Sequence, residues 1–96
     1  MISTQEFDSL CTGHFAALTL EGGPTLQGYT RRDSTHGKFI LFDGLATEDD
    51  GTVSKFSHRL ERSQIQAASL LSEPPSVTDC NGTIHRMRAA FWEETE

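Results

Sequence analysis

The sequence predicts a mainly β domain, namely a small five-stranded antiparallel barrel with a short N-terminal helix and a C-terminal extension. Three observations support this prediction. Apolar and polar residues alternate in several short runs between residues 14 and 71. Glycine-rich or acidic turns separate these runs. Gly28 lies inside one run, where a glycine usually marks a bend or a close approach of two backbones.

The chain begins with a short helix. Ser3 or Thr4 can cap this helix at its start, and Gly13 ends it. Phe7 and Leu10 lie three residues apart and therefore share one face of the helix. This apolar face can cover one end of the barrel.

Five strands are expected after the helix. The third is apolar on both faces, so we expect it to be a central strand that is covered on both sides. In the fifth, Ile65, Ala67, Ser69 and Leu71 are expected on one side, and this strand could close the barrel onto the first. The expected strands are residues 14–21, 25–32, 38–42, 53–61 and 65–71.

The chain divides into residues 1–72, the barrel with its helix, and residues 73–96, an extension packed on the barrel or trailing from it. Pro74 and Pro75 end the barrel. Asn-Gly at residues 81–82, between two short runs, indicates a hairpin, and the same region also has helical spacing. Strand is favoured over helix for residues 83–91. No internal repeat is expected.

The net charge of −6 argues against a general DNA or RNA binder, because such proteins need cations to replace the counterions of phosphates. It favours a basic protein as partner. The plainer alternative is that the acidity only maintains solubility.

Neither a cofactor site nor an active site is expected. Cys11 and Cys80 are too far apart for a Cys-x-x-Cys metal motif, and no two histidines have the spacing of a local metal pair. A helix C-terminus would raise the pKa of the Cys11 thiol, so we discount catalysis by a Cys11–His14 pair. No long apolar run indicates a secretion signal or a membrane span, so we expect a cytoplasmic, non-enzymatic protein.

Two acidic clusters are candidate partner-binding sites. One is an acidic loop that could imitate phosphates and occupy a basic groove, and the other is an acidic patch with an aromatic anchor on the helix. The alternatives are a solvated loop and a Phe7 that only covers the barrel end. The partner-binding candidates are Asp43, Glu48, Asp49 and Asp50 in the loop, and Glu6, Phe7 and Asp8 in the helix.

The basic residues give an alternative, a nucleic-acid site in which Tyr29 or Phe56 stacks on a base. They could equally form cross-strand ion pairs with Glu61 and Asp33, which we favour. The nucleic-acid-binding candidates are Arg31, Lys55, His58 and Arg59, with Arg32 and Arg62 nearby.

Several motifs resemble those of the Sm-like barrel family, and among its members the small acidic Rof proteins, which inhibit the transcription terminator Rho. The extension from Glu73 has no counterpart in that family. The motifs are Phe7-Asp8-Ser9-Leu10-Cys11, Leu18-Thr19-Leu20-Glu21-Gly22, Gly23-Pro24-Thr25-Leu26-Gln27-Gly28 and Phe39-Ile40-Leu41-Phe42-Asp43.

This resemblance implies a non-enzymatic inhibitor or regulator that docks an acidic surface on a basic nucleic-acid-binding protein and blocks its nucleic-acid site. Rho is the partner that the resemblance implies. An inhibitor of a bacterial defence nuclease would bind its target through the same attraction between an acidic and a basic surface. The alternative is a small Sm-like RNA- or nucleotide-binding module, as a ring oligomer or alone. A structural subunit whose acidity has no role is a third possibility.

Overall fold

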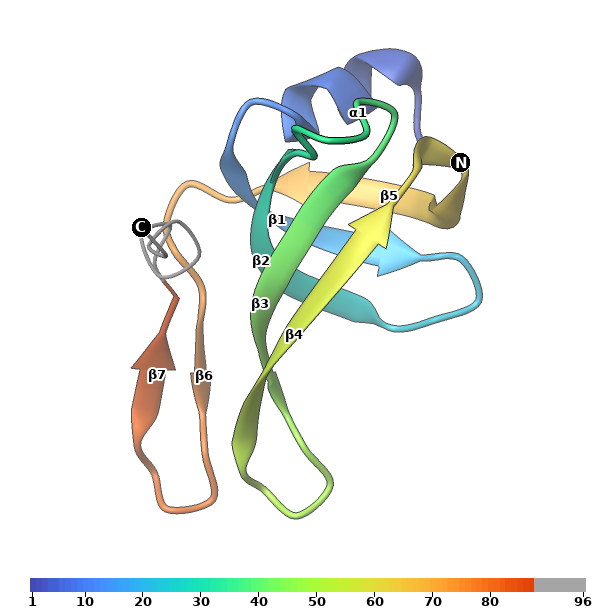
Figure 1. The fold of residues 1–96 in the computed structure, drawn as a ribbon. Coiled ribbons are helices and arrows are strands. Elements are labelled where there is room, and N and C mark those ends of the chain that lie inside the picture. Colours follow the sequence, from blue (N-terminus) through green and yellow to red (C-terminus); the bar gives the residue numbers. More distant parts are fainter. Residues whose placement is uncertain (88–96) are drawn as a thin grey trace.

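The computed structural model of this 96-residue chain describes residues 1–87 (Figure 1). One short helix precedes five strands, and a separate two-stranded hairpin follows them. The elements are α1 (Thr4–Leu10), β1 (His14–Leu20), β2 (Thr25–Arg32), β3 (Ile40–Thr47), β4 (Val53–Leu60), the 3₁₀ turn η1 (Arg62–Gln64), β5 (Ile65–Leu70), β6 (Ser76–Thr78) and β7 (Ile84–Arg86).

The five main strands form one curved antiparallel sheet in the order β4-β3-β2-β1-β5. The mainly β fold is thereby confirmed, and β5 pairs with β1 as expected. However, β4 and β5 are the two edges of the sheet and do not pair, so the sheet is not closed into a barrel.

The segment before α1 lies where β4 would have to approach β5. The backbone N–H of Ile2 donates to the carbonyl oxygen of Ile65 over 3.0 Å. The Arg62 guanidinium in turn donates through Nη1 to the carbonyl oxygen of Ile2 over 2.7 Å. The N-terminal segment, rather than β4, therefore provides the hydrogen-bond donor for the backbone carbonyl oxygen at the start of β5.

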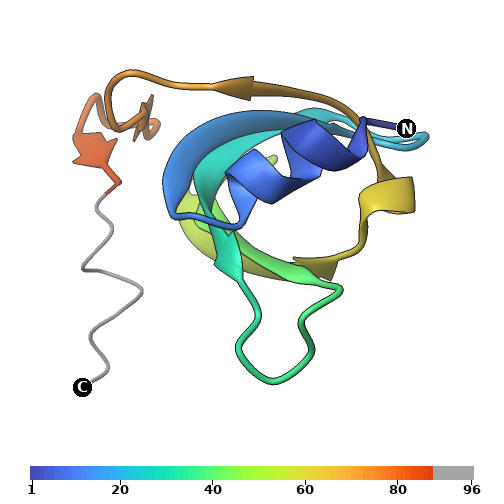
Figure 2. The same ribbon diagram turned by 90° about the horizontal axis from the view of Figure 1, so that it is seen from above.

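The core lies between the inward face of the sheet and α1, which covers the open end of the curved sheet (Figure 2). Each fully buried aliphatic or aromatic side chain stabilises the fold by about 1.5–3 kcal/mol relative to an exposed one. The buried core residues are Ile2, Phe7, Leu10, Ala16, Leu18, Ile40, Phe42, Leu60 and Ile65.

The start of α1 is fixed by a capping box. The Ser3 hydroxyl accepts from the N–H of Glu6 over 3.1 Å, and the Glu6 carboxylate accepts from the N–H of Ser3 over 2.9 Å. Ser3 is thus the residue that caps the helix, and Phe7 and Leu10 are its buried face, as predicted.

Gly28 marks a close approach of two strands, as its position predicted. A Cβ atom at Gly28 would lie 2.4 Å from the carbonyl oxygen of Asp43 in β3. Gly44, directly opposite, has the same constraint, because its Cβ would lie 2.6 Å from the carbonyl oxygen of Gln27. Two facing glycines therefore let β2 and β3 bend together.

The third strand differs from the prediction in two ways. It runs from Ile40 to Thr47, so the strand takes up part of the expected acidic loop. It is also not central, because β2 occupies the middle of the sheet, and Leu41 on the outer face is only half-buried. The four-residue apolar run reflects one deeply buried face and one partly covered face.

The predicted pattern of β5 is wrong after its first residue. The register with β1 shifts between Thr19 and Leu20, because Ile65 pairs with Leu20 whereas Ala67 pairs with Thr19. The extra residue is a β-bulge, which moves the following side chains to the other face. Ala68 therefore packs against the core, and Ala67 is exposed.

The C-terminal extension contains the predicted hairpin. β6 and β7 pair antiparallel, and residues 81–82 lie in the turn between them. Strand is confirmed for Ile84–Arg86, whereas residues 88–91 of the predicted strand lie outside the described residues. The division at residue 72 stays a prediction. No helix within residues 1–87 is long and apolar enough to cross a membrane.

Candidate functional site

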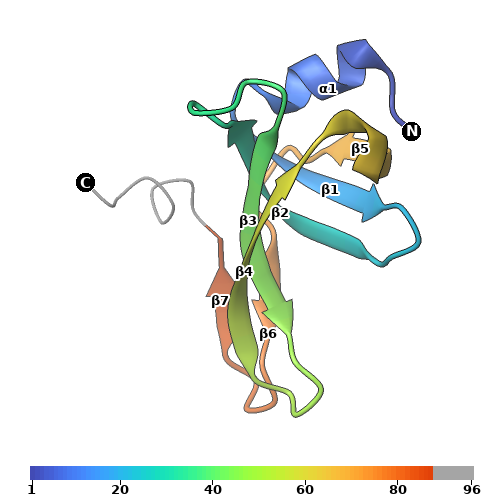
Figure 3. The same ribbon diagram turned by 45° about the vertical axis from the view of Figure 1, so that its right-hand side comes forward.

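Two hairpin turns lie side by side at the end of the molecule away from α1 (Figures 1 and 3). One joins β3 to β4, and the other joins β6 to β7. The backbone N–H of Cys80 donates to the carbonyl oxygen of Gly51 over 2.8 Å. We call residues 47–52 and 78–83 together the double tip.

The two turns share one sequence pattern and one geometry. In each, the N–H of the first acidic residue donates to the carbonyl oxygen of the final threonine, over 2.7 Å for Glu48 and 3.0 Å for Asp79. Gly51 and Gly82 have φ values of +89° and +85°, as a three-residue hairpin loop requires. The matching segments are Thr47-Glu48-Asp49-Asp50-Gly51-Thr52 and Thr78-Asp79-Cys80-Asn81-Gly82-Thr83.

This six-residue repeat corrects the expectation that the chain has none. The sequence contained the signal in its two Gly-Thr pairs, each with an acidic residue three positions before the glycine. It was missed because the first copy was interpreted as a loop and the second as a simple Asn-Gly turn.

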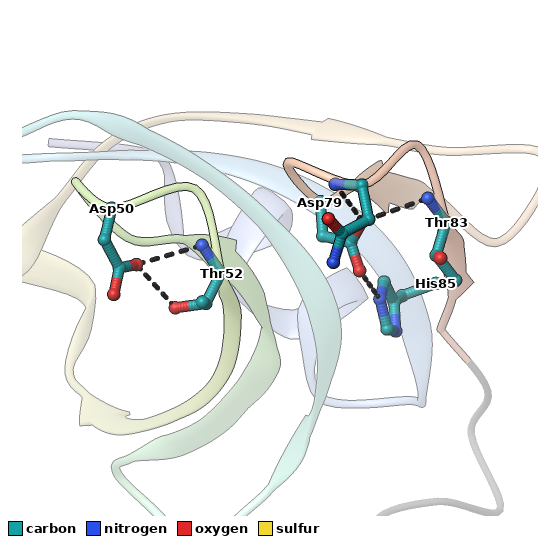
Figure 4. A network of polar contacts seen from close by, with 6 residues as sticks. Asp50, Thr52, Asp79, Thr83 and His85 are labelled. Carbon is teal, nitrogen blue, oxygen red and sulfur yellow. Dashed lines mark hydrogen bonds and ion pairs between the residues drawn. The ribbon is translucent and has the colours of Figure 1, made fainter.

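Carboxylates hold the first turn in shape. One oxygen of Asp50 accepts from both the hydroxyl and the N–H of Thr52, over 2.6 and 3.0 Å (Figure 4). These bonds, the hydroxyl first, lower the pKa of Asp50. Glu48 accepts from the Ser54 hydroxyl. Asp49 is exposed, and its side chain makes no hydrogen bond or ion pair with any residue from 1 to 87.

Asp79 organises the second turn in the same way, and sequence reasoning missed it. One oxygen accepts from the N–H groups of Asn81 and Thr83, over 2.9 and 3.0 Å. The other lies 2.9 Å from Nε2 of His85 (Figure 4). The His85 contact, followed by the Thr83 N–H, lowers the pKa of Asp79.

The remaining acidic candidates do not join the double tip. Asp43 lies on β3 with 6% of its surface exposed, opposite Tyr29 and Ser57, so the prediction that it shares a loop with residues 48–50 is wrong. Glu6 caps α1, Phe7 is part of the core, and Asp8 is exposed. These helix residues lie at the opposite end of the molecule (Figure 1).

Of the four nucleic-acid-binding candidates, the structure brings two together. Arg31 and Arg59 lie on the outer face of the sheet, each directly opposite Leu41 of the strand between them. Lys55 shares that face but lies four residues along β4 from Arg59, about 13 Å away at the strand rise of about 3.3 Å. His58 is on the inner face, where its ring lies 5.5 Å from that of Phe56.

Five basic residues gather around the β2–β3 connection, and we call them the basic end. Phe39 is its centre, because the Lys38 ammonium lies 5.3 Å and the Arg59 guanidinium 5.8 Å from its ring centroid. Lys38 and Arg62 line the same surface pocket of about 330 Å³. Of these five residues, only Lys38 was not among the basic residues that the sequence analysis named. The basic end comprises Arg31, Arg32, Lys38, Arg59 and Arg62.

Asp33 anchors the loop of the basic end. It is buried, with 3% of its surface exposed, and one oxygen accepts from the N–H groups of Thr35 and His36 over 2.8 and 3.3 Å. The other oxygen lies 2.9 Å from Nε of Arg59, so the expected ion pair is present, although the N–H does not point at the oxygen. The Thr35 N–H is the main cause that lowers the pKa of Asp33.

Both cysteines are free thiols. Cys11 is the C-cap of α1, and its pKa is raised mainly by burial, with Arg32 opposing the effect and Asp8 adding to it. The direction agrees with the sequence analysis, but the main cause is loss of water rather than the helix terminus. Among residues 1–87, no group of three or more His, Cys, Asp or Glu side chains could hold a metal ion.

Comparison with models of protein families, with curated proteins and with solved structures gave no match in any of the three.

Proposed function

We propose that the protein is a non-enzymatic inhibitor that docks the double tip on a basic nucleic-acid-binding protein and excludes the nucleic acid. The observation that carries this proposal is the hydrogen bond from Cys80 to Gly51, which joins two acidic turns into one surface. A single flexible acidic loop would lose more conformational entropy on docking than this paired surface does.

The charge of the double tip suits such a partner. It carries four carboxylates, and the contacts that hold Asp50 and Asp79 lower the pKa of each, so these two stay charged to a lower pH than a free aspartate. Complementary charge increases the rate of encounter and selects partners with a positive surface. The four carboxylates belong to Glu48, Asp49, Asp50 and Asp79.

The identity of the partner rests on the Sm-like resemblance. Five antiparallel strands behind a short N-terminal helix support an Sm-like assignment, whereas the open sheet leaves the closed barrel as part of the proposal. Within that family the Rof-type motifs imply Rho. A protein that binds RNA presents cations spaced for phosphates, and an array of fixed carboxylates can occupy them.

Direct binding to purified Rho tests the proposal. Affinity should fall steeply as salt rises, because exposed charges more than about 8 Å apart are screened at physiological ionic strength. Asp49→Lys should weaken binding, and Glu73→Lys, which makes the same change of net charge at another exposed site, should not. Equal affinity of the two variants would contradict docking through the double tip.

A capture experiment from a nuclease-treated bacterial lysate covers the case in which Rho is not the partner. The wild type and Glu73→Lys should retain the same basic protein, and the variant Glu48→Gln/Asp49→Lys/Asp50→Asn should lose it. The Gln and Asn substitutions remove charge but keep the acceptors of the turn. Retention by the triple variant would reject the acidic surface for any partner.

A second candidate function, binding of RNA or a nucleotide at the basic end, is favoured by one observation. Arg31 and Arg59 flank Leu41 on one face, and their guanidinium groups can contact phosphates. This candidate predicts that labelled RNA shifts at low salt and that Arg31→Ala or Arg59→Ala abolishes the shift. Absence of binding at low salt would end it.

A further inference from the structure

Most of the basic residues among residues 1–87 gather at one end of the molecule, and a cluster of carboxylates lies at the other. Five of the seven Lys and Arg residues among residues 1–87 form the basic end; the other two are Lys55 and Arg86. Four carboxylates form the double tip. β3 runs from one end to the other (Figure 3). This acidic chain therefore has a locally cation-rich surface within residues 1–87.

The two ends cannot neutralise each other within one molecule. The eight residues of β3 span seven steps, or about 23 Å at about 3.3 Å per residue. This is well beyond the screening length of about 8 Å at physiological ionic strength. Attraction between the two ends therefore acts only between molecules.

We propose that the double tip of one molecule docks on the basic end of a second copy. The contact is heterologous, because each molecule uses a different surface, so a dimer keeps one free end of each kind. This self-association goes beyond the proposed function and does not depend on it.

The geometry of both surfaces favours this contact. Asp49 is exposed in the double tip and its side chain has no partner among residues 1–87, and Lys38 and Arg59 present their charges around the ring of Phe39. An arginine held over an aromatic ring still offers N–H donors to a carboxylate. Asp33 is buried in its loop and forms an ion pair with Nε of Arg59 over 2.9 Å, so it offsets part of the charge of Arg59 and leaves Lys38 as the exposed cation beside the ring.

Electrostatic repulsion between two acidic molecules makes the association weak. The net charge of −6 repels two copies, and Asp8, Asp33 and Glu61 reduce the charge of the basic end. Exposed ion pairs contribute little each, and salt screens both attraction and repulsion. A concentration-dependent and salt-sensitive equilibrium is expected rather than a permanent dimer.

This association would cover the surface that the proposed function assigns to a partner. Self-association and partner binding would then compete, so the fraction of free double tips would fall as the protein concentration rises.

Sedimentation of the full chain at low and high salt tests the inference. The weight-average mass should rise with protein concentration at about 20 mM salt and return to the monomer value at about 500 mM. Glu73→Lys should behave as the wild type, and Asp49→Lys and Lys38→Glu should each stay monomeric. Monomeric wild type at millimolar concentration and low salt would overturn the inference.

A charge swap distinguishes this contact from any other self-association. An equimolar mixture of Asp49→Lys and Lys38→Glu should associate again, because the unaltered double tip of the Lys38→Glu molecule can dock on the unaltered basic end of the Asp49→Lys molecule. Failure of the mixture to associate, or persistent association of either variant alone, would reject the docking of double tip on basic end. Neither outcome bears on binding to Rho.

Discussion

The N–H of Cys80 donates to the carbonyl oxygen of Gly51, and the Cβ of Cys80 fills the space beside Gly51 where any other residue would carry its own Cβ. This contact joins residues 29 positions apart and fixes the C-terminal hairpin to the sheet. This contact brings the two acidic turns together in the surface that we assign to the partner.

Gly51→Ala should detach the two turns. An alanine at φ +89° costs about 1–2 kcal/mol, and its Cβ would lie only 2.6 Å from the Cβ of Cys80. Gly82→Ala is the matched control, because its φ of +85° is similar and nothing lies within 4 Å of its Cβ. Amide exchange at Cys80 should be faster in Gly51→Ala than in Gly82→Ala, and equal rates would show that the contact is not needed.

Gly28→Ala should destabilise the sheet by about 3 kcal/mol or more, because the new Cβ would lie 2.4 Å from a backbone oxygen that can move only with β3. Gly23→Ala serves as the control, since its nearest neighbour lies at 3.7 Å. Urea unfolding measures both. A small effect for Gly28→Ala would mean that the two strands are not held together at this point.

Asp33 should make folding stability depend on acid pH. Its pKa is lowered in the folded state, so the carboxylate contributes stability that is complete above its unfolded pKa of about 3.9. That stability is lost as the pH falls through the folded value. Asp33→Asn should be less stable than the wild type at neutral pH and lose less stability on acidification.

The control for the acid prediction is Asp8→Asn, because Asp8 is exposed and its carboxylate accepts no hydrogen bond from any residue between 1 and 87. Thermal unfolding from pH 7 to about pH 3 provides the comparison. If the stability of Asp33→Asn falls as steeply on acidification as that of the wild type, the acid sensitivity arises from other carboxylates, such as Asp50 and Asp79.

The second turn should depend on the Asp79 acceptor. Asp79→Ala removes the acceptor of two backbone N–H groups, so exchange of the Asn81 and Thr83 amides should accelerate. Asp79→Asn keeps an amide oxygen in the same place and should protect these amides better. Identical exchange in the two variants would show that the turn is held by its backbone alone.

Much of the fold follows from local patterns. The strand boundaries at residues 14, 25 and 53 and the buried face of α1 could be predicted, because alternation and capping act over a few residues. The predicted end of the third strand, at residue 42, is too early. Strand pairing continues β3 through Asp43, which lies opposite Tyr29 and Ser57. The register of β5 depends on a bulge that no local pattern encodes.

The site was harder to predict than the fold. Glu48, Asp49 and Asp50 could be grouped as candidates from the sequence because they are adjacent in it. Asp79 was missed because its role depends on a contact between two turns. The repeated turn pattern would have indicated that both segments form the same structure, but only the folded chain shows that they touch.

The displacement of labelled single-stranded RNA from purified Rho measures directly whether the double tip blocks a nucleic-acid site. We expect the wild type and Glu73→Lys to release the RNA as their concentration rises, whereas Asp49→Lys should require about tenfold more protein, which corresponds to about 1.4 kcal/mol. If all three release the RNA equally, or if the wild type binds Rho and leaves the RNA in place, the double tip does not block a nucleic-acid site.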